Sequence, residues 1–414
     1  MTTSRLFKKT VIAVTVSSLG FASQQALAAG FQLNSQSATG LGRAFAGDAV
    51  IADNASVMAR NAAAMTLFDS HQFSGGFNVI ASEIDVKDIG GSGSFPGQQS
   101  DVTNEATSLV PNIYYVHRLN NEWAFGVGLY SNFGTTNEFD GSFGDNNLAK
   151  VYGGNTEISS INLTMNAAYR INEQWSVGGG LDIVQGSGKL ERSTSPSTPG
   201  LGESKVVDID ADGLGIGFNL GAVYELNENN RFGLAYHYSP TVTADGKVNY
   251  IADPDATSID LKLPSMAEFS GYHRITDTKF AVHYSLQWIG WSVFDNVETD
   301  NGAEIKDYEW KDGYHIAVGS TYYLNDAWTL RAGYMYDTAA QDDVRSISVP
   351  DSDRQWFSAG FGYHFNKRHT VDFGFTYLVG KDTKVTENSS VSSELTATTK
   401  ANAILAGLQY SYSF

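Results

Sequence analysis

The chain of 414 residues contains no cysteine and only eight prolines. Without cysteine there is no disulfide framework, and metal sites built on thiolates are excluded. An exported chain of this kind therefore needs another source of stability. Glycine, tyrosine and phenylalanine are instead abundant, with 42, 21 and 23 residues.

Basic residues are scarce as well. The 27 lysines and arginines stand against 45 acidic residues, which gives a formal net charge of −18. Proteins that bind nucleic acid carry a basic surface for the phosphates, so this balance argues against nucleic acid as a partner. Many acidic residues lie in expected outer loops, such as residues 337–353. There they are either solvated or bind cations that bridge to anionic lipid headgroups.

Long apolar segments are missing after the N-terminus. The chain starts with the basic residues Arg5, Lys8 and Lys9, an apolar run over residues 11–21, and Ala-Leu-Ala at 26–28. These are the three regions of a secretory signal peptide, and the apolar run is too short for a transmembrane helix. We therefore predict a signal peptide at residues 1–28 and a mature chain that begins at Ala29.

Alternation of apolar and polar residues dominates the chain after about residue 70. In residues 280–288 one face carries Phe280, Val282, Tyr284, Leu286 and Trp288, and the other carries small or polar side chains. Because side chains alternate across a strand, this pattern predicts strands with one apolar face. Two environments fit: a soluble sandwich, or a membrane barrel with lipid outside and a polar lumen.

The turns favour the membrane barrel. Short polar turns are expected at residues 120–121, 172–174, 227–230, 276–278, 325–327 and 366–368, and longer Gly- and Asp-rich connections lie between them. Short turns at one end and long loops at the other are typical of outer-membrane barrels. Six such turns predict seven hairpins, or about fourteen antiparallel strands, over residues 71–414.

Aromatic residues follow these turns at regular spacing. Each of five rings comes just after a turn, namely Trp123, Trp175, Phe232, Phe280 and Trp328. Amphipathic aromatics prefer the membrane–water interface, so we expect a girdle at the inner surface of the membrane. In a soluble protein the same rings would be core residues.

The C-terminus ends on an alternating strand. Phe414 is the last residue, and Tyr412, Tyr410, Leu408, Ala406 and Ile404 precede it at every second position. This resembles the C-terminal signal that the barrel assembly machinery of the outer membrane reads. We therefore expect that machinery to be a partner through Phe414, and the protein to reside in the outer membrane of a Gram-negative bacterium.

Residues 29–70 lack sustained alternation and are rich in Ala, Ser and Gly. A barrel of about fourteen strands leaves a pore unless something fills it. The sequence therefore predicts that this segment is a plug, or hatch, inside the barrel.

The mature chain resembles the FadL family of outer-membrane transporters for long-chain fatty acids. The likeness is carried by residues 29–34, 40–44, 51–53 and 60–61, and further along by 132–134, 190–192, 310–312, 319–323 and 347–351. The resemblance implies a fourteen-stranded barrel with an N-terminal hatch. It also implies passive uptake: capture near the outer loops, a tighter internal site, and lateral exit into the membrane beside a kinked strand.

Specific residues follow from that resemblance. The kink corresponds to Asn132, Phe133 and Gly134, and glycine within a strand often marks a bend. The ligand carboxylate would be bound by Arg192 and Lys311. Cations suit a carboxylate, and a guanidinium can contact both of its oxygens.

Two departures from the family pattern stand out. The family's hatch motif is Asn-Pro-Ala, whereas this chain has Asn61, Ala62 and Ala63, and loss of proline frees φ and restores a backbone donor. Gating of the hatch is therefore expected to differ. The connection over residues 193–205 is also short and polar for the family's surface-capture loop.

No catalytic constellation, metal site or cofactor motif is apparent, so we expect no enzyme. The alternatives are a transporter of other hydrophobic compounds such as aromatic hydrocarbons, an open diffusion porin, and an adhesive barrel. The basic residues Arg192 and Lys311 argue against a transporter of other hydrophobic compounds. The predicted plug argues against an open diffusion porin.

Overall fold

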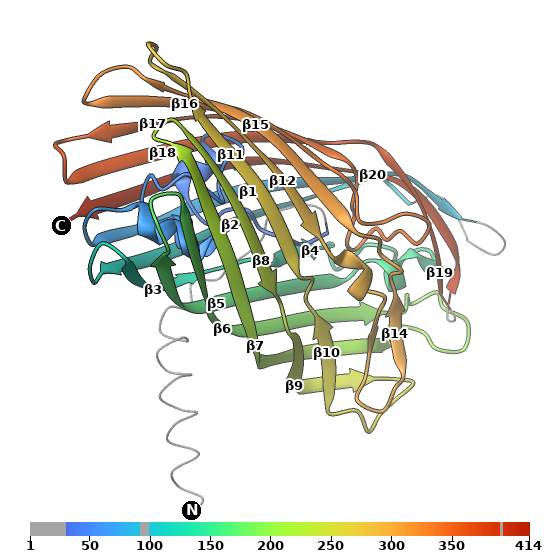
Figure 1. The fold of residues 1–414 in the computed structure, drawn as a ribbon. Helices are drawn as coiled ribbons and strands as arrows, with labels where there is room; N and C mark the ends of the chain where they lie inside the picture. The colour runs from blue at the N-terminus through green and yellow to red at the C-terminus, as the bar shows by residue number, and fades with distance from the viewer. Residues whose placement is uncertain (1–29, 92–98, 390–391) are drawn as a thin grey trace, which may run out of the picture.

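The computed structural model describes residues 30–91, 99–389 and 392–414, so the predicted signal peptide lies outside the described residues. The wall is one antiparallel sheet of 18 assigned strands. Four of these continue a neighbour across a break, so the described part of the chain forms a wall of 14 strands (Figure 1). The predicted fold class, a fourteen-stranded barrel with a plug, is confirmed.

The elements alternate long strands with short helical turns. The helical elements are α2 (Ala38–Leu41), η1 (Ala55–Ala59), η2 (Ala62–Leu67), η3 (Leu148–Tyr152) and η4 (Trp291–Val293). The strands are β1 (Gln72–Gly91), β2 (Val102–Arg118), β3 (Trp123–Tyr130), β4 (Gly134–Glu138), β5 (Asn155–Arg170), β6 (Trp175–Ser193), β7 (Lys205–Asn227), β8 (Asn230–Tyr238), β9 (Thr241–Tyr250), β10 (Ser258–Lys262), β11 (Met266–Arg274), β12 (Phe280–Ile289), β13 (Asn296–Glu298), β14 (Glu304–Asp307), β15 (Gly313–Tyr323), β16 (Trp328–Asp337), β17 (Arg354–His364), β18 (His369–Gly380), β19 (Thr383–Ser389) and β20 (Ser392–Ser413). No helix in the described residues is long and apolar enough to cross a membrane.

The first and last strands close the barrel. β1 pairs with β20 from Gln72 opposite Ser413 to Gly91 opposite Leu395, and the backbone N–H of Phe414 donates to the carbonyl of His71. A closed sheet has no unpaired edge, which a strand in hydrocarbon cannot tolerate. The alternating C-terminal residues are thus the strand that completes the wall.

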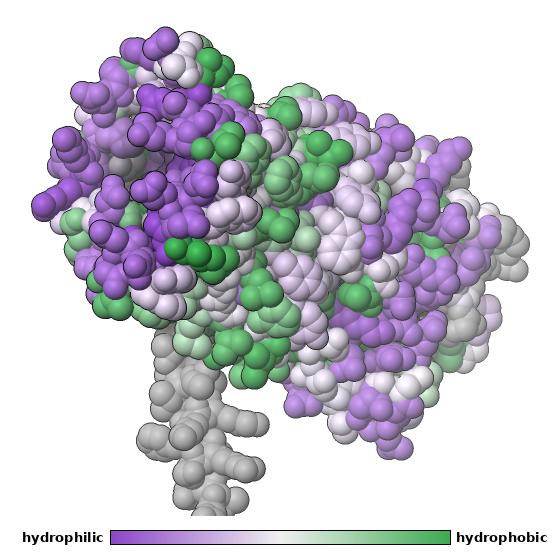
Figure 2. Space-filling model, viewed as in Figure 1, coloured by the Kyte–Doolittle hydropathy of each residue, from purple (hydrophilic) through white to green (hydrophobic). Residues whose placement is uncertain are grey.

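The outer face carries an apolar band. On β7 the outward residues Leu214, Ile216, Phe218 and Leu220 are exposed, and Asp210 and Asp212 follow toward the long loops. Figure 2 shows the hydrophobic band between two hydrophilic ends. Apolar residues on the lipid side and a charged rim beyond them place the membrane around the middle of the wall.

All six predicted short turns join neighbouring strands at the same end of the barrel. Four of the five aromatic residues after the turns are paired across the strands, a feature that was not predicted. Four tyrosines lie directly opposite them, in the pairs Trp123–Tyr169, Trp175–Tyr224, Phe280–Tyr322 and Trp328–Tyr363, with ring centroids 4.6–4.8 Å apart. Cross-strand aromatic pairs of this kind stabilise sheets.

The segment after Gly30 fills the lumen up to β1, and most of its residues are buried. Buried ion pairs tie it to the wall. Arg43 binds Asp48 and Asp53, each at 2.8 Å, and Arg331 of β16 binds Asp53 at 3.3 Å. Arg60 approaches Glu268 of β11 at 3.6 Å. The charged residues of the N-terminal motifs therefore pair with each other and with the barrel, as buried charges must.

Glycines in the wall let the hatch backbone come close. Gly42 packs on Gly360, the carbonyl of Ala38 faces Gly374, and the carbonyl of Arg43 faces Gly333. A Cβ at Gly333 would lie closer to that carbonyl than real Cβ atoms approach backbone. The glycines Gly333, Gly360 and Gly374 on β16–β18 thus form the surface on which the hatch backbone packs, which we call its seat.

We predict that Gly333→Ala lowers the free energy of unfolding by about 1–3 kcal/mol, because the added methyl group forces the hatch off its seat. Guanidinium unfolding of the refolded protein measures the change. Gly141→Ala is the control, since its Cβ would meet nothing within 4 Å. Equal stability of the two variants would contradict this seat.

Candidate functional site

The wall is interrupted at the predicted kink. β3 ends at Tyr130 and β4 starts at Gly134, and both pair with β5. The bent segment is bound from inside by the start of the hatch: Leu33 N–H donates to Asn132 O at 2.6 Å, and Gly134 N–H donates to Phe31 O at 2.7 Å. The hatch thus takes the place of a wall partner at residues 132–134.

This bend leaves a gap in the ladder. β2 pairs with β3 only through Ile113–Arg118, so residues 102–112 have no ladder with β4 among the described pairings. Instead, Asn104 Nδ2 of β2 donates to Asn137 Oδ1 of β4 at 2.7 Å. Between β2 and β4 a side-chain hydrogen bond thus stands where neighbouring strands elsewhere in the sheet are joined by a backbone ladder.

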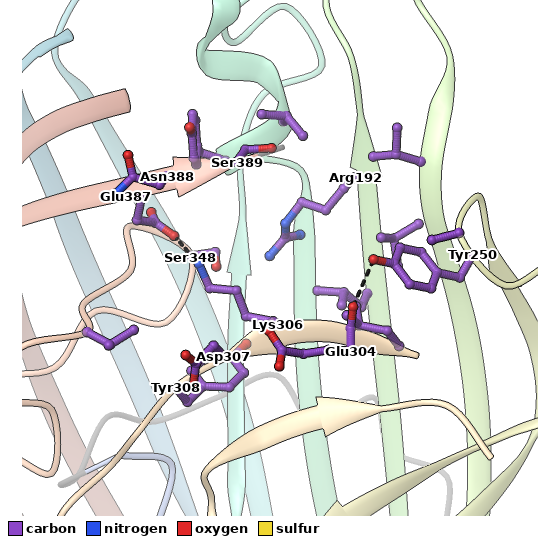
Figure 3. A pocket seen from close by; sticks show the side chains of 18 of the residues that line it. Arg192, Tyr250, Glu304, Lys306, Asp307, Tyr308, Ser348, Glu387, Asn388 and Ser389 are labelled. Carbon is purple, nitrogen blue, oxygen red and sulfur yellow. Dashed lines mark hydrogen bonds and ion pairs between the residues drawn. The ribbon is translucent and has the colours of Figure 1, made fainter. Parts of the chain in front are cut away.

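A cavity of ≈ 600 Å³ opens between the loops at the end opposite the short turns (Figure 3). Its walls come from η3, β6, β7, β9, β14, the loop before β17, and β19. The lining mixes apolar and charged side chains, including Leu190, Val207, Ile305, Arg192, Lys306 and Glu387. Such a mixture suits a ligand with an apolar body and a charged end.

Arg192 lies at this cavity, near the end of β6. Its Nη1 donates to Asn155 O at 2.9 Å and to Glu191 O at 2.7 Å, and its Nη2 donates to Thr156 Oγ1 at 2.6 Å. No carboxylate of the described residues lies within 4 Å of it. The guanidinium is held in place by neutral groups, and its charge remains available to an anion.

Lys306 of β14 points into the same space (Figure 3). Its Nζ is 2.6 Å from Glu387 Oε1, and Glu387 is only 4% exposed. Burial alone would lower the pKa of Lys306, but the charge and hydrogen bond of Glu387 raise it above its usual value. The lysine is therefore held protonated inside the cavity.

Lys311 is not brought to Arg192. It is exposed at the surface, and its Nζ is 2.9 Å from Asp342 Oδ2. Lys306 lines the cavity with Arg192, where the sequence analysis expected Lys311. No local pattern singles out Lys306, which lies in the short strand β14 inside a long connection. Carboxylate binding by Arg192 and Lys311 stays a prediction.

An aromatic column continues from the cavity to the kink. Tyr308 lines the cavity, and its ring is 4.8 Å from that of Phe294. The ring of Phe294 is 5.1 Å from that of Phe31, and the ring of Phe31 is 6.1 Å from that of Phe133. Trp291 and Trp310 complete this buried cluster. Apolar surface therefore connects the cations to the gap, with hatch residue Phe31 in the middle.

The hatch turn at residues 61–63 is fixed to the wall. Asn61 caps η2 by accepting from Ala63 N at 3.0 Å, and its Nδ2 donates to Ala49 O at 2.7 Å and to Ala222 O of β7 at 3.1 Å. The Ala62–Ala63 backbone lies against Gly178 of β6. Without proline, the turn is still held by these bonds; its role in gating stays a prediction.

These features define a plugged outer-membrane β-barrel with a cavity of mixed apolar and charged lining between its outer loops. The family described as "Outer membrane protein transport protein (OMPP1/FadL/TodX)" matches residues 19–414. The chain belongs to this family, as the sequence motifs indicated. It is a transport protein of the Gram-negative outer membrane and not an enzyme.

Named relatives cover all or nearly all of the chain. A "Long-chain fatty acid transport protein" of Escherichia coli O6:H1 is 35% identical over 100% of both chains. "Outer membrane protein P1" of Haemophilus influenzae is 34% identical over 94% of this chain and 95% of its own. Among solved structures, a Pseudomonas aeruginosa FadL homologue superposes with a TM-score of 0.81 at 23% identity, over 93% of this chain and 100% of its own. The Pseudomonas putida toluene transporter TodX superposes with 0.68 at 18% identity, over 93% and 100%, and shares the fold.

We predict that Asn61→Ala lowers the free energy of unfolding by about 2 kcal/mol, because a helix cap and two bonds to buried carbonyls are lost together. Asn147→Ala is the matched control. Asn147 caps η3 in an outer loop in the same way, through Ala149 N, and its Nδ2 donates to the side chain of Gln99 rather than to the wall, so its loss should cost about 1 kcal/mol. If denaturant unfolding gives the same loss for both variants, the wall contacts of Asn61 contribute nothing.

Proposed function

We propose that the protein takes up long-chain fatty acids passively across the outer membrane. One observation carries the proposal: a cavity on the loop side brings Arg192 and Lys306 together at the head of an aromatic column that leads to a gap in the wall. A fatty acid has the matching chemistry, one carboxylate and a long apolar chain. The names of the 35%-identical relatives support the same substrate class.

The carboxylate binds in the cavity between the outer loops. Arg192 offers a fixed guanidinium that has no ion pair with an acidic residue in the described part of the chain, and Lys306 adds a second cation. Charge-assisted hydrogen bonds to a carboxylate are about twice as strong as neutral ones. A toluene-like hydrocarbon has no group for either cation, so this site favours a fatty acid over an aromatic hydrocarbon.

The alkyl chain leaves sideways. Rearrangement of Phe31 and the adjoining hatch residues frees the column, and the ligand exits beside Asn132, Phe133 and Gly134 between β2 and β4. The hatch turn at Asn61, Ala62 and Ala63 keeps the rest of the plug on the wall. Transfer to the lipid needs no energy source, because trapping of the ligand downstream gives the direction. Docking of Phe414 to the assembly machinery belongs to biogenesis and precedes transport.

We predict that Arg192→Ala weakens oleate binding to the refolded barrel by about 1.5–3 kcal/mol, because one charged contact is lost. Titration calorimetry measures the change. Lys311→Ala is the matched control, since it also removes one cation from the outer loops but lies on the surface beside Asp342.

Loss of binding in the Lys311 variant alone would place the carboxylate at Lys311 and reject the cavity. Saturable binding of toluene with no binding of oleate would reject the fatty-acid assignment in favour of hydrocarbon transport.

We further predict that a disulfide between Asn104→Cys and Asn137→Cys blocks oleate uptake by whole cells while leaving oleate binding intact. The bond would lock β2 to β4 across the exit, and the chain has no other cysteine to interfere. Reduction should restore uptake.

The control is Ser159→Cys with Ser187→Cys, whose hydroxyls are 2.6 Å apart on the continuous β5–β6 ladder. This disulfide should leave uptake unchanged. Undiminished uptake through the locked gap would show that the ligand leaves by another path.

A further inference from the structure

A carboxylate already occupies one cation of the proposed ligand site. Glu387 of β19 lines the cavity and is almost fully buried. Its Oε1 accepts from Lys306 Nζ at 2.6 Å, and its Oε2 accepts from Ile347 N at 2.8 Å. The two oxygens therefore act on different parts of the protein, because one binds the cavity lysine and the other holds the loop between β16 and β17.

The same loop reaches the gap in the wall. Asn137 Nδ2 of β4 donates to Ile347 O at 2.9 Å and to Ser348 O at 3.2 Å. Asn137 Oδ1 in turn accepts from Asn104 of β2, the contact that spans the gap. Four consecutive hydrogen bonds therefore join Lys306 to Asn104 through Glu387, Ile347 and Asn137.

We propose that Glu387 takes the place of the ligand carboxylate on Lys306 when the cavity is empty. Its displacement by the ligand couples ligand binding to the Asn104–Asn137 contact. In the empty protein Glu387 binds Lys306. When a fatty acid arrives, its carboxylate replaces Glu387 on the lysine. The inference rests on the proposed function of this cavity.

For Lys306 the exchange costs little, because one carboxylate replaces another. Lys306 keeps an anionic partner throughout, so no buried cation is left without one. Glu387 is left as a buried carboxylate without a cation, so it has to turn from its buried position toward solvent. This movement pulls on the backbone of Ile347, which Glu387 also holds. Asn137, bound to the other side of the same residue, is displaced in turn. The ligand thereby weakens the contact that closes its exit.

The first test compares oleate binding to wild type, Glu387→Gln and Glu304→Gln. Glutamine keeps the size of Glu387 and an acceptor for Ile347 N, but it no longer competes for Lys306. Affinity should rise about tenfold, the equivalent of one charged hydrogen bond. Glu304→Gln removes a charge from the same cavity without an ion pair to Lys306, so it should change little.

Two further measurements separate competition from misfolding. Oleyl alcohol, which has no carboxylate, should bind the wild type and Glu387→Gln alike, which also shows that the variant is folded. Glu387→Asp keeps the charge but is one methylene shorter, so it should give a smaller gain than glutamine. An unchanged or lower oleate affinity of Glu387→Gln would overturn the proposal.

The second test measures the coupling itself. An Ala106→Cys protein keeps Asn104, Asn137 and Glu387, and its thiol lies in the small pocket between β2 and β4. Oleate should speed alkylation of this thiol, because the ligand separates β2 from β4. Adding Glu387→Gln should abolish this effect of oleate, since no internal carboxylate remains to be displaced. If oleate speeds alkylation equally in both backgrounds, the coupling does not pass through Glu387. Failure of the wild type to bind oleate at all would instead reject the proposed function.

Discussion

Complete pairing of backbone polar groups is the constraint on which this structure depends. In hydrocarbon an unpaired N–H or C=O costs several kcal/mol, so the sheet has to close, as β1 and β20 do. The gap beside β4 departs from that rule, and the chain compensates from within. The start of the hatch supplies backbone bonds to Asn132 and Gly134, and Asn104 bonds to Asn137. At this place the wall is thus held by contacts that are weaker and fewer than those of a ladder.

Closure creates a second demand, because a barrel of this width encloses space that has to be filled. The hatch fills it with backbone packed on glycines and with charges paired to the wall. Both kinds of contact are costly to disturb: a glycine seat accepts no added methyl group, and a buried charge accepts no loss of its partner. Movement is therefore expected to concentrate at the N-terminal end, where Phe31 lies among aromatic rings rather than among ion pairs.

The barrel could be predicted from the sequence because its signals are local. Period-two alternation and six short turns set the strand number, and each strand pairs with its neighbours along the chain. The residues of the cavity, in contrast, are not marked by local sequence patterns. Lys306 lies in a short hairpin within the β12–β15 connection, Arg192 lies near the end of β6, and Glu387 belongs to β19. Only the closed barrel and its packed loops bring these residues together. Motif likeness placed the kink near the break in the structure, but it drew attention to Lys311, which is exposed.

The position of Glu387 follows from the same electrostatics that make the cavity attractive to a carboxylate. A cation buried without a partner would be expensive in the empty protein, so the chain supplies a carboxylate of its own. That carboxylate makes the site stable when empty and ready for exchange, because an incoming anion replaces an equivalent one. Arg192, whose hydrogen bonds go to neutral groups, gives the ligand one cation with which Glu387 forms no ion pair in the described structure. A paired lysine beside an available arginine is therefore what a site needs if it is to bind a fatty acid and afterwards release it.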